Sequence, residues 1–244
     1  MTATTDPLGE SRYDPRSDGV LREAGQAAVR PRDAATLILV RRDGAQPRVL
    51  MGRRNRGHDF MPDKWVFPGG RVDPADARAP AAAELRPEVQ ALLARTAPRR
   101  PALPRTLAMA AVRETFEEAG LLLGRPGAVR PGVGPWRPFL AKGVAPDLAA
   151  LTFVARAITP PYRPKRFDAR FFMAEAERLH SLERASDCGE LDEIAWVELE
   201  EAMALDLPNI TRFVLGDLRE RLAEPDRPVP SMRFLRGQRR LEHL

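Results

Sequence analysis

The sequence predicts a mixed α/β (α+β) domain, and three observations support this class. Strand-like and helix-like segments alternate along the 244 residues, which is typical of a sheet covered by helices. Hydrophobic residues make up 43% of the chain, enough for a sizeable core, and no internal repeat is present. We therefore expect one domain over residues 31–224, preceded by a mobile arm over 1–30 and followed by a basic tail over 225–244.

The first expected elements form a β-hairpin. Residues 34–41 (AATLILVR) predict a buried strand, and residues 48–54 (RVLMGRR) predict its partner across a turn. A short apolar piece at 65–67 then stops at Pro68, Gly69 and Gly70. We expect a sharp loop at these glycines, because glycine permits backbone angles and close approaches that other residues do not.

Helical periodicity and flanking residues predict the rest. Helices are expected at 87–96 and 105–120, the second with Gly120 at its C-terminal end. Residues 77–104, rich in Ala, Pro and Arg, predict a partly helical insertion that projects from the surface and leaves the sheet undisturbed. Further elements are expected as a short helix at 21–29, loops over 124–147, strands at 151–158, 167–173 and 193–199, and helices at 200–205 and 209–222.

Composition and charge narrow the class of protein. No apolar run approaches the ~20 residues of a membrane helix, and the N-terminus lacks the apolar stretch of a secretory signal. One cysteine, Cys188, excludes an internal disulfide framework. We therefore expect a cytoplasmic location and no membrane partner. The net charge is +5, yet no basic patch interleaved with aromatic residues is evident, so nucleic acid is not favoured as a partner. A homodimer is left open.

Three carboxylates gather in residues 113–121 (RETFEEAGL). On a helix, Glu114, Glu117 and Glu118 fall on the face opposite the apolar one, which predicts an exposed acidic face. Carboxylates at this spacing repel one another unless a cation lies among them. Hard cations bind carboxylate oxygens, so we expect Mg²⁺ or Mn²⁺ here, with Arg113 orienting the cluster. The alternative interpretation is a solvated acidic face without a ligand.

Together with the VFPGG of residues 66–70, this stretch resembles the signature of the Nudix hydrolase superfamily. The second half of the signature matches at Arg113, Glu114, Glu117, Glu118, Gly120 and Leu121. The first half matches at Gly70, preceded by Gly69, and Asp76 stands where the family has glutamate. Residues 77–104 separate the two halves, and Thr115 replaces an apolar residue.

This resemblance implies a Nudix fold, a mixed sheet between helices, and an enzyme that depends on a divalent cation. The implied reaction is the hydrolysis of a diphosphate linkage in a nucleoside-diphosphate derivative, with phosphate charge neutralised by the cation. The insertion point, together with residues 158–160 (ITP) and 166–172 (RFDARFF), also resembles the coenzyme A diphosphatase-like subgroup. Coenzyme A or its acyl esters are then the expected substrates. The alternatives are an ADP-ribose or dinucleotide pyrophosphatase, and a non-catalytic nucleotide-binding module.

Further residues are candidates for the base and for substrate binding. The segment GELDEIAWVEL resembles the Nudix region that contributes an extra carboxylate, which nominates Glu190 or Glu193 as the base. Basic residues that could contact phosphates are Arg53, Arg54, Arg56, Arg71, Arg163, Lys165 and Arg166. For the two glutamates the alternative is an acidic loop without a catalytic role, and for the basic residues it is solvated surface charge.

Overall fold

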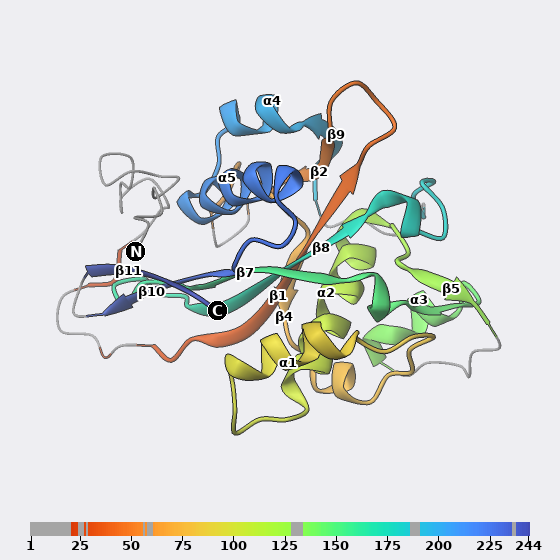
Figure 1. Cartoon of the computed structure of the whole chain (residues 1–244), viewed down its shortest axis with the longest axis horizontal. Coiled ribbons are helices and arrows are strands. Elements are labelled where there is room, and N and C mark those ends of the chain that lie inside the picture. Colours follow the sequence, from red (N-terminus) through yellow and green to blue (C-terminus); the bar gives the residue numbers. More distant parts are fainter. Residues whose placement is uncertain are drawn as a thin grey trace.

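The computed structural model describes residues 21–23, 27, 29–55, 57, 61–127, 134–185, 191–235 and 238–244. Within these residues, nine strands form one mixed sheet (Figure 1). The strands are β1 (Arg32–Arg41), β2 (Arg48–Arg53), β3 (Trp65–Val66), β4 (Gly69–Arg71), β7 (Thr152–Ile158), β8 (Phe167–Glu175), β9 (Glu193–Glu198), β10 (Pro230–Leu235) and β11 (Gln238–His243). Their order is β11–β10–β7–β8–β1–β2–β3, while β4 pairs with β1 and β9 pairs with β2.

Helices cover both faces of the sheet, so the predicted mixed α/β (α+β) class is confirmed (Figure 1). On one face lie α1 (Pro87–Arg95), α2 (Leu103–Ala119) and α3 (Arg137–Leu140), near a small sheet of β5 (Gly124–Pro126) and β6 (Val144–Pro146). On the other face lie α4 (Leu199–Ala204) and α5 (Asn209–Ala223). Short 3₁₀ helices are η2 (Pro74–Ala77), η3 (Gly134–Trp136), η4 (Leu148–Ala150) and η5 (Ala176–Arg178). No helix in the described part of the chain is both long and apolar enough to cross a membrane.

The core has two layers, one on each side of the central strand β1. Side chains alternate along a strand, so Leu37 and Leu39 pack on the α2 side while Ile38 and Val40 pack on the α5 side. All four are fully buried. Burial on both faces explains why the sequence of β1 is a continuous apolar run rather than an alternating one.

Most of the elements expected from the sequence are present. The predicted hairpin is confirmed, since β1 and β2 are antiparallel with Val40 opposite Val49. The two predicted helices correspond to α1 and α2, and the second ends at Gly120, whose φ of 70° suits glycine. The strands and helices expected between 151 and 222 correspond to β7, β8, β9, α4 and α5.

Several expectations were wrong. Gly69 and Gly70 do not form a loop; they form the strand β4, which pairs with residues 34–36 of β1. The stretch 225–244 is not a tail outside the domain, because β10 and β11 form a hairpin at the edge of the sheet and β10 pairs with β7. Residues 124–147 hold β5, α3 and β6 rather than loops alone.

Of the expected helix at 21–29, residues 21–23, 27 and 29 are not helical, and the others lie outside the described residues, as does most of the expected arm.

Residues 77–104 lie on the α2 side of the molecule, and none of them belongs to a strand of the large sheet. Leu85, Val89 and Leu93 are buried in the core cluster that contains α2. Arg100 forms an ion pair with Asp33 at the start of β1, with 2.6 Å between Nη1 and Oδ2. This segment is therefore packed onto the domain rather than merely projecting from it, and it leaves the sheet intact.

Candidate active site

A cleft of about 1170 Å³ opens where α2 passes β4. One part of its wall carries Arg113, Glu114, Glu117 and Glu118 from α2, and Gly69, Gly70 and Arg71 from β4. Another part carries Arg163, Lys165 and Arg166 from the segment between β7 and β8. The fold therefore brings acidic and basic candidate residues, distant in the sequence, to the same cleft.

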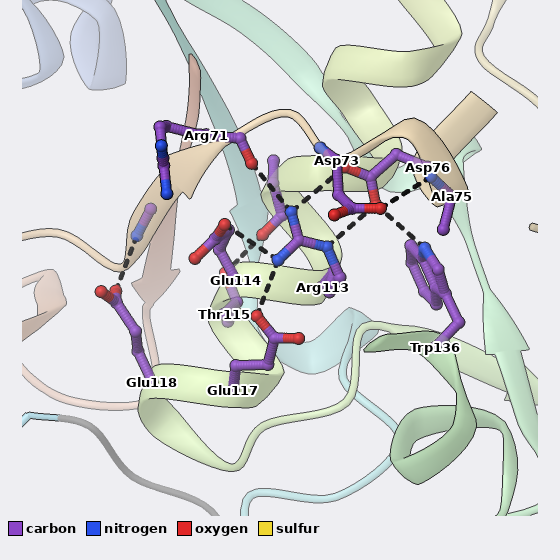
Figure 2. Close-up of polar contacts among 12 residues, drawn as sticks. Arg71, Asp73, Ala75, Asp76, Arg113, Glu114, Thr115, Glu117, Glu118 and Trp136 are labelled. Carbon is purple, nitrogen blue, oxygen red and sulfur yellow. Dashed lines mark hydrogen bonds and ion pairs between the residues drawn. The ribbon is translucent and has the colours of Figure 1, made fainter. Parts of the chain in front are cut away.

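Arg113 is the centre of the site, and all five of its guanidinium N–H groups donate hydrogen bonds (Figure 2). Nε and Nη2 donate to the carboxylate of Asp76 at 2.9 and 3.1 Å, and Nη2 also donates to the carbonyl of Arg71 at 2.9 Å. Nη1 donates to Glu114 at 2.9 Å and to Glu117 at 2.7 Å. Burial opposes the charge of Arg113, but these carboxylates outweigh it and raise the pKa of the guanidinium.

Asp76 is a buried hydrogen-bond partner of Arg113. Its side chain is fully buried and accepts from Arg113, from Trp136 Nε1 at 2.9 Å and from the backbone N–H of Asp73 at 2.8 Å. Asp76 does not line the cleft, so its role is to position Arg113. Trp136 was not expected from the sequence; it lies 60 positions from Asp76 along the chain and packs edge-on against Phe139. No local pattern signals such a long-range hydrogen bond.

The two glycines of β4 allow a close approach on both sides of the strand. The N–H of Gly69 donates to Glu118 Oε2 at 2.8 Å. A Cβ on Gly70 would lie 2.4 Å from the carboxyl carbon of Glu114, and a Cβ on Gly69 would lie 2.7 Å from the carbonyl oxygen of Ala35. Neither glycine has a positive φ. Glycine is required here for space rather than for a turn.

The predicted exposed acidic face is wrong, because β4 packs against Glu114 and Glu118. Glu118 is 8% exposed, and the side chains of Glu114 and Glu117 are 15% and 29% exposed. The alternative of a solvated acidic face fails for the same reason. Periodicity places these residues correctly on one side of α2, but it cannot show that a strand packs against that side.

Arg53 and Glu193 lie outside the cleft. They form an ion pair with 3.2 Å between Nη2 and Oε2, as expected for residues that are opposite each other in the β2–β9 register. Neither lines the cleft, so the structure does not bring them to the α2 carboxylates. The next residue, Arg54, was expected with Arg53 and Arg56 to contact phosphates, and it does line the cleft. Arg56 lies outside the described residues. The other base candidate, Glu190, lies outside the described residues.

The basic residues after β7 differ in their surroundings. Arg163 is only 2% exposed and its guanidinium lies 5.7 Å from the centre of the Tyr162 ring. Arg166 donates from Nε to the carbonyl of Thr159 at 3.0 Å and from Nη1 to that of Val29 at 2.7 Å. The neighbouring Asp168 pairs with Arg156 and Arg170 instead. The described residues therefore supply no carboxylate partner for Arg166.

The α2 carboxylates suit a hard divalent cation in their chemistry, although they do not converge. The described residues contain no group of three or more His, Cys, Asp and Glu side chains that could hold a metal ion as arranged. Arg113 holds one oxygen of Glu114 and one of Glu117, and Gly69 holds one of Glu118. Three carboxylates on one helix beside a glycine strand nevertheless form an oxygen-rich donor set.

We expect cation binding at this site to weaken as the pH falls below about 7. Burial, with the charge of Glu117, raises the pKa of Glu114 to about 7 against the opposing effect of Arg113. A cation that binds Glu114 must displace its proton, so affinity falls by up to about tenfold per pH unit below that pKa. Mn²⁺ titrations at pH 6 and pH 8 measure the difference, and Glu114→Gln should remove it. Equal affinity of the native chain at both values would contradict the assignment.

The chain is similar in sequence and structure to proteins named as Nudix hydrolases. No family model matches the chain. The chain is 27% identical over 184 residues to “Putative nudix hydrolase 7” of Caenorhabditis elegans, a match over 70% of this chain and 53% of that protein. The chain thus spans about half the length of this curated relative. A crystal structure of a Nudix hydrolase from Alicyclobacillus acidocaldarius is 29% identical with a TM-score of 0.58, over 81% of this chain and 97% of that one.

The NUDIX domain of Shewanella oneidensis NrtR, solved with ADP-ribose, is 14% identical with a TM-score of 0.45, over 87% of this chain and 95% of that one. The C. elegans relative and the A. acidocaldarius neighbour bear the name of Nudix hydrolases, which are pyrophosphohydrolases and generally use divalent metal ions. By the first two likenesses the chain is similar to Nudix hydrolases, and its signature residues Gly70, Arg113, Glu114, Glu117 and Glu118 line one cleft.

Proposed function

We propose that the chain hydrolyses a diphosphate linkage in a nucleoside-diphosphate derivative, with Mg²⁺ or Mn²⁺ as cofactor. The observation that carries this proposal is one cleft lined by three α2 carboxylates and, from another segment, by three basic residues. A metal-bridged diphosphate needs carboxylates for the cation and cationic donors for the remaining phosphate oxygens. A cleft with only one kind of charge would not serve both.

In this proposal Glu114, Glu117 and Glu118 hold the cation. When bound, it neutralises phosphate charge and lowers the pKa of a coordinated water. The chain's own contribution is to fix the carboxylates: Arg113 holds Glu114 and Glu117, and the N–H of Gly69 holds Glu118.

We propose the loop carboxylate Glu190 as the base. The second candidate, Glu193, is paired with Arg53 and does not line the cleft, so its placement does not favour that role.

A phosphate-release assay with and without Mg²⁺ tests the proposal. We expect release that requires the divalent cation, with a panel of coenzyme A, acyl-coenzyme A, ADP-ribose, NADH and diadenosine polyphosphates to identify the leaving group. Nucleotide binding without any cation-dependent release would favour the non-catalytic module instead. The cytoplasmic location and the homodimer also remain predictions.

Coenzyme A is the substrate that we propose within this class. The support is the resemblance of residues 158–160 and 166–172 to the coenzyme A diphosphatase-like subgroup, together with the charges beside them. Coenzyme A carries a 3′-phosphate in addition to its diphosphate. Arg163, Lys165 and Arg166 line the same cleft as the glutamates, and their positive charges suit a second phosphate.

Arg166→Ala is expected to raise KM for coenzyme A about tenfold and to change KM for 3′-dephospho-coenzyme A much less. The variant removes a charged donor whose bonds to the described part of the chain go to two carbonyls and not to a carboxylate. Steady-state kinetics with both substrates measure the two changes, and Arg95→Ala, on the exposed side of α1, is the control. If Arg166 only anchors Val29 and Thr159, both KM values should shift together.

A further inference from the structure

Arg54 is a second guanidinium that acts on the α2 carboxylates. It directly follows β2, and its backbone N–H donates to the carbonyl of Lys64 at 3.0 Å, which fixes the start of its side chain at the cleft. Burial lowers the pKa of Arg54, and the charges of Glu118 and Glu114 oppose that effect. The guanidinium therefore lies within electrostatic reach of both carboxylates.

The guanidiniums of Arg113 and Arg54 interact with different members of the carboxylate cluster, and both interact with Glu114. Arg113 bonds to Asp76, Glu114 and Glu117, uses all five of its donors and sits on a buried helix. Arg54 acts on Glu118 and Glu114 from a segment that follows a strand end, on a long side chain with several rotatable bonds. Arg113 thus comes to the cluster from α2 itself, whereas Arg54 comes to it from the end of β2.

A divalent cation and Arg54 would compete for the same carboxylates. Once a cation neutralises Glu114 and Glu118, the attraction that holds the guanidinium is lost and the two positive charges repel each other. A diphosphate arriving in the cleft then offers Arg54 a new partner. A planar guanidinium can donate two parallel hydrogen bonds to phosphate oxygens, and these bonds are stronger where water is displaced.

We propose that Arg54 contacts the substrate: its guanidinium balances Glu118 and Glu114 until the divalent cation binds, and then pairs with the diphosphate of the substrate. This inference rests on the proposed function, because it takes the cation and the diphosphate from there. It adds a residue that the family signature does not contain, and it assigns that residue two successive partners.

The neighbouring Arg53 provides a matched control. It has the same side chain one position earlier, but it forms an ion pair with Glu193 and lies outside the cleft. Arg53→Gln and Arg54→Gln each remove one positive charge, at neighbouring positions of the chain. Only the change at Arg54 should reach the carboxylates.

The test measures two binding constants on the full chain, neither of which requires turnover. In Arg54→Gln, Mn²⁺ alone should bind about threefold or more tightly, because a competing cation is gone. The same variant, saturated with Mn²⁺, should bind adenosine 5′-(α,β-methylene)diphosphate about tenfold or more weakly, because a charge-assisted hydrogen bond is lost. Arg53→Gln should change neither constant. Arg54→Lys should keep the native Mn²⁺ affinity and recover analogue binding only in part.

Opposite shifts in the two constants support the inference, because damage to the fold would weaken both. Weakening of both constants, no change in either, or equal effects of Arg53→Gln would each overturn it. The proposed function is judged separately by cation-dependent phosphate release. Opposite shifts in the two binding constants without any phosphate release would support the binding role of Arg54 but not the proposed function. Phosphate release by the native chain, with neither binding constant changed in Arg54→Gln, would overturn the role of Arg54 alone.

Discussion

Replacing Glu118 with glutamine is expected to lower kcat at least about 10²-fold, a loss of roughly 2.7 kcal/mol of transition-state stabilisation. Glutamine has nearly the same shape but lacks the charge that a divalent cation needs from its ligand. Steady-state hydrolysis at saturating Mg²⁺ measures the loss, and a Mn²⁺ titration should show weaker binding. The matched control is Glu88→Gln, which removes a carboxylate from the exposed side of α1.

The Glu118→Gln variant is expected to fold, although Glu118 is only 8% exposed. This side chain accepts a hydrogen bond from the N–H of Gly69, and an amide oxygen can accept the same bond. Near-normal turnover in a folded Glu118→Gln variant would exclude Glu118 as a cation ligand. Loss of the folded state would instead show that its charge stabilises the packing of α2 against β4.

The sequence predicted those parts of the fold that depend on local pattern. The continuous apolar run of β1, the periodicity of α2 and the glycine at its end are each visible within a short window. The same window placed Glu114, Glu117 and Glu118 on one side of α2. It could not show what packs on that side, so a face covered by β4 was expected to be exposed.

The site details that the sequence missed all depend on contacts between distant segments. Trp136 reaches Asp76 from another part of the chain, and Gly69 and Gly70 become a strand because β1 pairs with them. The sequence nominated Arg53 and Arg54 alike, and only the tertiary structure shows that Arg54 lines the cleft while Arg53 does not. Pairing partners and side-chain direction at a strand end are tertiary properties, and no local propensity encodes them.

Gly70→Ala is expected to lower kcat about 10²-fold while the chain stays folded. The new Cβ would lie 2.4 Å from the carboxyl carbon and 2.4 to 2.5 Å from the oxygens of Glu114. Because this carboxylate is the end of a flexible side chain, it can move aside at little cost to the fold. It would then leave the position in which Arg113 holds it at 2.9 Å, and displacements of about 1 Å can cost 10²-fold in rate.

Gly69→Ala separates this effect from a loss of stability. Its Cβ would lie 2.7 Å from the carbonyl oxygen of Ala35 and 2.7 Å from the Cα of Thr36, which are backbone atoms of the central strand. Backbone atoms there cannot move without breaking the pairing of β4 with β1, so Gly69→Ala should lower the melting temperature far more than Gly70→Ala. Adding Glu114→Gln to Gly70→Ala should cost little further activity, since both changes remove the same carboxylate from its place. Fully additive losses in the double variant would mean that Gly70 acts on the reaction by a route other than Glu114.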